Sequence, residues 1–335
     1  MVFSRVKPSA ESQFPLGALS YRQGDQYLAL LIIEGIYAAL VAIANLLVIS
    51  VLVIYIYIIY IIVANLVAST SLKALVECSF VPYYAIQRNF SLFAPNRVFT
   101  EEYELAIFNL SVLADYGTLF FSVLIALNRL SVLVFSDYNF SRKANAAACL
   151  TTWLLSMCLP IIFFVFKCKY RYSSENIYYN VCMDFSKPAQ LLISVVVYCS
   201  YAVVFVVIAI YAGLFWMLRG IKRTLGMTTG ISEVQTGILR QSATIFFIYA
   251  ISIGISLSTE FMDTGPAANV FLVIYLANFS NLAIALVLPM CLLAMSGDIR
   301  SILFAMIPFG GDPSAPTTVV PNIAGKAPVE GAFII

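Results

Sequence analysis

The sequence predicts an all-α membrane protein, built as a bundle of seven membrane-spanning helices. Of its 335 residues, 61% are hydrophobic and only 11% are charged, whereas a soluble domain has about 45–50% apolar and about 25% charged residues. The apolar runs are long and unbroken, which favours spanning helices of about 20 residues over the ~10-residue alternating strands of a barrel. This composition excludes a disordered chain, a collagen and a soluble multidomain enzyme.

Seven runs are long enough to cross a bilayer as helices. They lie near Tyr27–Tyr55, Ile58–Tyr83, Glu104–Phe135, Asn145–Phe166, Ala189–Leu218, Gly237–Thr259 and Ala268–Ala294. Between Leu28 and Leu72 the single charged residue is Glu34, and one helix of that length would span ~68 Å, more than twice the hydrocarbon thickness. We therefore expect a chain reversal near the tyrosine cluster of Tyr55–Tyr60, because tyrosine favours the membrane interface.

The flanking segments complete the predicted organisation. Residues 1–26 are expected to form an extracellular N-terminal segment without a signal-peptide core. Residues 27–307 form the helical domain, which ends in a short amphipathic helix at 297–307. Residues 308–335 are rich in Pro, Gly and small side chains and are expected to be a disordered cytoplasmic tail. Each side of the membrane carries nine basic residues in this topology, so the positive-inside rule does not orient the chain.

Four acidic or basic residues lie well inside the predicted helices, away from their ends: Glu34, Lys73, Glu77 and Asp115. Burying such groups in a membrane is costly, so each marks a candidate site. Lys73 and Glu77 are four residues apart and can pair directly, either as a structural bridge or as a ligand contact. Asp115 has the same two interpretations: it binds a ligand, or it bonds to a neighbour such as Lys73.

A polar stripe runs along the predicted third helix. Its members at steps of four, three and four residues share one helical face, and they are Ser111, Asp115, Thr118 and Ser122. Such a stripe must avoid lipid, so it lines the bundle interior or a cavity. The candidate ligand-binding residues are therefore Asp115, Ser111, Lys73 and Glu77.

The composition also limits the chemistry. The chain has no histidine, which excludes imidazole-dependent nucleophiles and His-ligated zinc. A net charge of only +2 gives no indication of the strongly basic surface that binds nucleic acid. We expect no catalytic residue, metal site or cofactor. Cys168 and Cys182 lie in the loop after the fourth helix; they pair with each other, or one of them reaches Cys78.

Short motifs occur in a fixed order along the helices. They are Asn128–Leu130 at the end of the third helix, Trp153 and Pro160 in the fourth, and Asn281–Ser296 with Pro289 in the seventh, followed by Gly297–Arg300. With these motifs the chain resembles the nematode serpentine chemoreceptors, which are divergent rhodopsin-like G-protein-coupled receptors. It is most similar to their class gamma superfamily, over about Leu28 to Phe304.

The resemblance implies roles for individual residues. Arg129, next to Asn128, would engage a heterotrimeric G protein at the cytoplasmic end of the third helix, with Arg219 and Arg223 presented nearby. Asn45 and Asn65 would belong to a core polar network, and Pro289 would permit a hinge because proline lacks an N–H.

Several positions depart from the family pattern. Asn128 replaces the usual acid, Glu104 replaces the usual disulfide cysteine, and the sixth helix lacks the Cys-Trp-x-Pro element.

The resemblance thus implies a chemosensory receptor that binds a small-molecule odorant or pheromone in the outer half of the bundle. It would lie in the plasma membrane of sensory cilia, surrounded by lipid, with a second copy as a candidate dimer partner. A small-solute transporter or channel is the alternative, since charged membrane residues fit it too, although the chain lacks an internal repeat. An intramembrane Ser-Lys enzyme using Lys73 is a third.

Two sequons lie on opposite sides of the predicted membrane. Asn89, between the second and third helices, would be glycosylated if the tail is inside, whereas a glycan on Asn139 would invert the topology.

Overall fold

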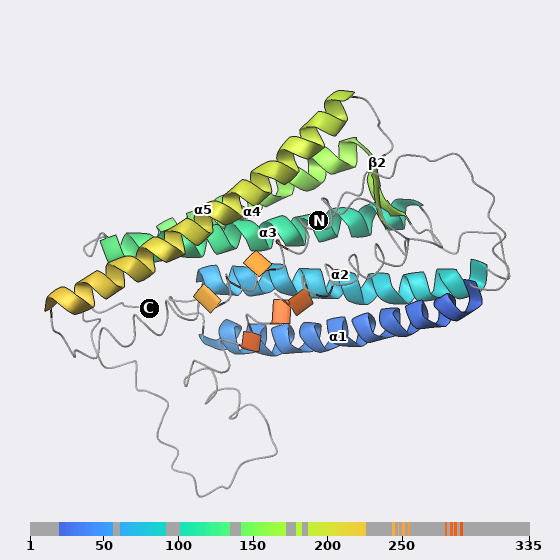
Figure 1. The fold of residues 1–335 in the computed structure, drawn as a ribbon, viewed down its shortest axis with the longest axis horizontal. Coiled ribbons are helices and arrows are strands. Elements are labelled where there is room, and N and C mark those ends of the chain that lie inside the picture. Colours follow the sequence, from blue (N-terminus) through green and yellow to red (C-terminus); the bar gives the residue numbers. More distant parts are fainter. Residues whose placement is uncertain are drawn as a thin grey trace, which may run out of the picture.

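The computed structural model describes residues 20–55, 61–91, 101–134, 142–171, 179–182 and 187–225, with further single positions between 243 and 290. The described chain folds into five long helices and one hairpin (Figure 1). These are α1 (Ser20–Tyr55), α2 (Ile61–Ser91), α3 (Glu101–Val134), α4 (Arg142–Val165), β1 (Cys168–Arg171), β2 (Tyr179–Cys182) and α5 (Lys187–Leu225).

The five described helices fall on the predicted segments, and each extends past the predicted bounds at one end or both. The reversal inside the first apolar run lies where it was predicted, because α1 ends at Tyr55 and α2 begins at Ile61. However, α1 begins at Ser20, inside the segment predicted to precede the helices. Because α2 continues to Ser91, the prediction that Asn89 lies between the second and third helices was wrong, and this residue belongs to the last turn of α2.

The remaining predicted elements are described in part or not at all. Within the predicted sixth and seventh helices, the described positions between 243 and 254 and between 279 and 290 are helical. The predicted amphipathic helix at 297–307, the tail at 308–335 and the sequon at Asn139 lie outside the described residues. The loop after the fourth helix contains an antiparallel hairpin of β1 and β2 that was not predicted.

The outer surface of the described bundle is apolar along whole helices. All five described helices are long and apolar enough to cross a membrane. Exposed leucine, isoleucine and valine side chains recur at helical spacing on α1 and α4, at Ile36, Leu40, Ile43, Leu47, Leu150, Leu154, Ile161 and Val165. Stripes of this length are unfavourable against water but match lipid hydrocarbon, so they mark the lipid-facing side of each helix.

The core is centred on α3, which packs against α2, α4, α5 and β1. The rings of Phe108 on α3 and Phe163 on α4 are fully buried and meet edge to face, with centroids 5.8 Å apart. Nearer the other end of α3, Phe121 meets Trp153 of α4 at 5.2 Å in the same arrangement. Edge-to-face contacts align the negative ring face with the positive edge, so they fix how α3 and α4 lie against each other.

A close approach between α2 and α3 depends on a glycine. Ser69 of α2 donates a hydrogen bond to the carbonyl of Ala114 (2.9 Å) and lies 3.2 Å from the hydroxyl of Thr118. A Cβ built on Gly117 would collide with the Ser69 hydroxyl. Small residues let membrane helices approach closely enough for such contacts.

We predict that Gly117→Ala will destabilise the helical bundle by about 1–3 kcal/mol, because the added methyl overpacks the α2–α3 contact. Thermal unfolding of the purified protein measures this effect. Gly213→Ala is the matched control, since nothing lies within 4 Å of a Cβ built there. Equal unfolding temperatures for the two variants would contradict the assigned close approach.

Candidate functional site

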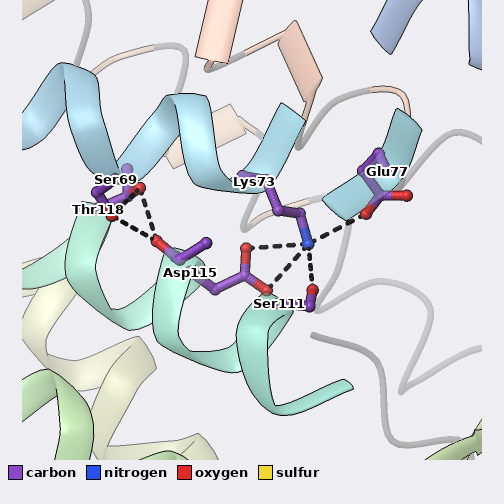
Figure 2. Close-up of polar contacts among 7 residues, drawn as sticks. Ser69, Lys73, Glu77, Ser111, Asp115 and Thr118 are labelled. Carbon is purple, nitrogen blue, oxygen red and sulfur yellow. Dashed lines mark hydrogen bonds and ion pairs between the residues drawn. The ribbon is translucent and has the colours of Figure 1, made fainter. Parts of the chain in front are cut away.

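A buried ionic cluster joins α2 to α3 (Figure 2). The ammonium of Lys73 donates a hydrogen bond to the hydroxyl of Ser111 at 2.8 Å. It lies 3.1 and 3.2 Å from the two carboxylate oxygens of Asp115, and 3.2 Å from Oε1 of Glu77. The side chains of Lys73 and Glu77 are each 9% exposed and that of Asp115 is 27% exposed. The structure thus brings together the four residues that the sequence singled out as candidate ligand contacts.

Helical spacing creates this cluster. Lys73 and Glu77 are separated by one turn of α2, as are Ser111 and Asp115 on α3, so each pair projects from one face. The predicted stripe on α3 faces the bundle, since Ser111, Thr118 and Ser122 are all buried. Asp115 is the most accessible member of the cluster.

The cluster contains more carboxyl groups than cationic groups. Two carboxylates, Glu77 and Asp115, share the single ammonium of Lys73. Oε2 of Glu77 is buried, and no described residue donates a hydrogen bond to it. A buried acceptor without a partner is costly, so this oxygen is an unfilled position within the site.

A second polar contact links α1 and α2 to the seventh predicted helix. Asn45 is fully buried and donates hydrogen bonds of 2.9 Å to the carbonyls of Val41 and Ala285. Thr70 donates to the amide oxygen of Asn45 at 3.0 Å. Ala285 lies four residues before Pro289, which has no N–H for its carbonyl. Asn45 therefore donates to the carbonyl of Ala285, which Pro289 leaves without its usual backbone donor. Through this carbonyl, Asn45 of the predicted polar network contacts the segment that contains the predicted hinge at Pro289.

A third contact ties α2 to α4. The indole N–H of Trp153 donates to the amide oxygen of Asn65 at 2.8 Å, and the amide nitrogen of Asn65 donates to the carbonyl of Ile61 at 2.7 Å. Both polar groups of the Asn65 side chain are therefore satisfied inside the bundle, as lipid surroundings require.

The residues assigned to G-protein coupling lie near the C-terminal ends of α3 and α5. Asn128 and Arg129 are partly buried near the end of α3, and Arg219 is exposed near the end of α5. Arg223 also lies in α5, but its side chain is outside the described set. Figure 1 shows that α3 and α5 end on the same side of the bundle, away from the hairpin. The structure therefore separates these residues from the ionic cluster along the helix axis.

The hairpin is held on α3 by ion pairs. Lys169 of β1 is buried, and its ammonium lies 3.0 Å from a carboxylate oxygen of Glu101 and 3.9 Å from one of Glu104. Sequence reasoning missed this anchor. A signal was present, because the sequence has a carboxylate, Glu104, at the top of the third helix, where the resemblance implies a cysteine.

The two loop cysteines face each other across the hairpin. Cys168 is buried and disulfide-bonded, and the strand register places it opposite Cys182. Cys78, the alternative partner considered from the sequence, is a free thiol. The register therefore favours the local pair.

The chain was compared with known families and structures. Residues 120–309 match the family model described as Serpentine type 7TM GPCR chemoreceptor Srv. No curated protein gives a significant sequence match. Among solved structures, the fold is similar to that in a crystal structure of squid rhodopsin, with a TM-score of 0.69 and 14% sequence identity. This similarity covers 85% of this chain and 81% of the rhodopsin chain, so the predicted rhodopsin-like seven-helix fold is confirmed.

We predict that Lys73→Met will destabilise the protein by about 3–5 kcal/mol, because it leaves two neighbouring buried carboxylates without a counter-charge. The unfolding temperature and the yield of folded protein measure the loss. Lys143→Met removes an exposed lysine on α4 and serves as the control. A Lys73→Met protein as stable as this control would contradict the described ion pairs.

We also predict that Cys168 pairs with Cys182. Peptide mapping of the non-reduced protein should recover one cross-linked peptide that contains both residues. A cross-link from Cys168 to another cysteine would contradict the pairing that the strand register favours.

Proposed function

We propose that this chain is a chemosensory receptor. The family model matches more than half of the chain, which therefore belongs to the serpentine type seven-transmembrane G-protein-coupled chemoreceptors of type Srv. In this proposal a small-molecule odorant or pheromone binds in the outer half of the bundle, and the receptor signals to a heterotrimeric G protein at the cytoplasmic face. The observation that carries the ligand site is the buried ionic cluster between α2 and α3.

The cluster suits a ligand site for an energetic reason. Charged groups inside a membrane are rare and are retained where they serve a function. Here the cluster combines a satisfied cation at Lys73 with an unfilled acceptor on Glu77 and a partly accessible carboxylate on Asp115. A ligand that engages these carboxylates changes the forces between α2 and α3 directly.

Continuous helix connects the cluster to the proposed coupling end. Asp115 and Arg129 lie on one unbroken helix, α3, with a rise of ~21 Å between them. A ligand that binds one packing of the helices better than another shifts the receptor population toward that packing. Movement of α3 would then displace Arg129, and the contact of Asn45 with Ala285 near the Pro289 hinge would carry the change to the seventh helix.

Other features of the proposal follow from the motifs rather than from the fold. We propose membership of the class gamma superfamily of nematode receptors, location in the plasma membrane of sensory cilia, and the residue sets Arg129, Asn128, Arg219 and Arg223 for coupling. Contacts with lipid and a receptor dimer belong to the same proposal, as does the lack of nucleic-acid binding. A transporter or channel is not favoured by any contact among the described residues.

Replacing Arg129 with Ala should abolish ligand-evoked second-messenger signals in a heterologous cell while the receptor still reaches the surface. The reason is that Arg129 is assigned to the G-protein contact. Lys143→Ala is the control, because it removes another basic side chain near the same ends of the helices. It should keep the response within about two-fold of the wild type. An unchanged response in Arg129→Ala would remove the assigned coupling role.

Glycosylation should occur on Asn89 if the N-terminus and the hairpin face the outside. An Asn89→Gln receptor expressed in eukaryotic cells should then lose the mass shift that endoglycosidase removes from the wild type. The Asn139→Gln receptor is the control and should keep its glycan. A glycan on Asn139 would instead place the tail outside and reverse the proposed orientation.

A further inference from the structure

We propose that the ligand accepted by the ionic cluster is an organic cation, a molecule whose ammonium group is bound by Glu77 and Asp115. The inference rests on the proposed receptor function and adds the chemical class of the ligand. From the sequence alone, Asp115 and the Lys73–Glu77 pair permit an amine, an acid or a neutral polar molecule.

The N–H donors of Lys73 are already engaged, which disfavours the binding of an acidic ligand. A lysine ammonium has three N–H donors and no acceptor. Within the cluster, three side chains already take these donors: Ser111 at 2.8 Å, Asp115 at 3.1 Å and Glu77 at 3.2 Å. A ligand carboxylate would have to displace one of these partners, and it would add a third carboxyl group to a site that already holds two.

The unused capacity of the site is that of an acceptor. Oε2 of Glu77 is buried and accepts no hydrogen bond from any described residue, and only 7% of the surface of Glu77 is exposed. Figure 2 shows this carboxylate with one oxygen on Lys73 and the other directed away from it. An incoming N–H donor would satisfy the orphaned oxygen, and its positive charge would balance the second carboxylate of the cluster.

The surroundings favour an organic ammonium over a hydrated metal ion. Cys78, next to Glu77 in α2, packs with Tyr37 against the small apolar cluster of Val41, Ala42, Ala74 and Ala285. Tyr37 stacks on Phe279 with ring centroids 4.5 Å apart. A ligand that reached Glu77 from this side of α2 would meet these apolar and aromatic side chains, which suit the carbon skeleton of an amine, and an aromatic ring face attracts a cation. A metal ion would require several further oxygen ligands, and the described residues contain no group of acidic or cysteine side chains arranged to hold one.

The direct test uses purified receptor in lipid nanodiscs and small probes that fit a buried site. Unfolding temperatures are compared in methylammonium chloride, sodium chloride and N-methylglucamine chloride at equal ionic strength, and in methylammonium formate as the anion comparison. We expect methylammonium to raise the unfolding temperature by about 2–4 °C over the bulky glucamine cation, the size expected when the probe exceeds its Kd several-fold. Formate should add nothing to this shift.

Variants assign the shift to the cluster. Glu77→Gln should lose it, because the amide removes the excess charge while keeping the shape. Asp115→Asn tests the same charge from α3 and replaces Glu77→Gln if that protein does not fold. Glu102→Gln, which neutralises an exposed carboxylate on α3, is the matched control and should keep the full shift.

Several outcomes would overturn the proposal. These are equal unfolding temperatures in methylammonium and glucamine, an undiminished shift in the Glu77→Gln or Asp115→Asn receptor, a larger effect of formate, or an equal shift with sodium. The last result would identify an alkali-ion site instead of an amine site. Because the assay contains no G protein, its failure leaves the Arg129 signalling experiment to decide the receptor function separately.

Discussion

Lipid hydrocarbon offers no hydrogen bonds, so every polar group on a spanning helix must find its partner inside the protein. Apart from the unsatisfied Oε2 of Glu77 and the amide oxygen of Asn109, the described bundle meets this constraint in two main ways. Serine and threonine hydroxyls bond back to the carbonyl four residues earlier on their own helix, as Ser122 does to Thr118 and Ser156 does to Thr152. Larger polar side chains have more groups than their own helix can satisfy, so they reach across to a neighbour and decide which helices touch.

The second helix makes most of these cross-helix contacts. From its first turns upward, Asn65 binds Trp153 of α4, Ser69 binds the backbone of α3, and Thr70 binds Asn45 of α1. Lys73 then binds Asp115 of α3. Successive polar residues of α2 therefore point to different neighbours at different depths, because each step of 100° around the helix faces another partner. The contact of Asn45 with Ala285 extends the same network to the helix that contains Pro289.

Much of this arrangement was predictable from the sequence, because helical periodicity is a local property. The polar stripe of α3 and the i,i+4 spacing of Lys73 and Glu77 place side chains on faces without knowledge of the fold. The partners of those faces are different, since they depend on how helices far apart in sequence are packed. The contact between Asn65 and Trp153 joins residues 88 positions apart. The ion pair from Lys169 to α3 likewise depends on a hairpin whose strands no periodicity indicated.

Stability alone does not account for the composition of the ionic cluster. Taking charges out of water costs several kcal/mol per ion, and a buried ion pair is often no more stabilising than apolar residues of similar volume. If the cluster only joined α2 to α3, Lys73 and Asp115 with the hydroxyl of Ser111 would suffice. Glu77 adds a second carboxylate with one oxygen unsatisfied, which weakens the resting arrangement. Under the proposed cation binding, Glu77 would gain the partner that it lacks here. A packing that presents both carboxyl groups to the ligand would then be favoured by the differential binding on which a receptor depends.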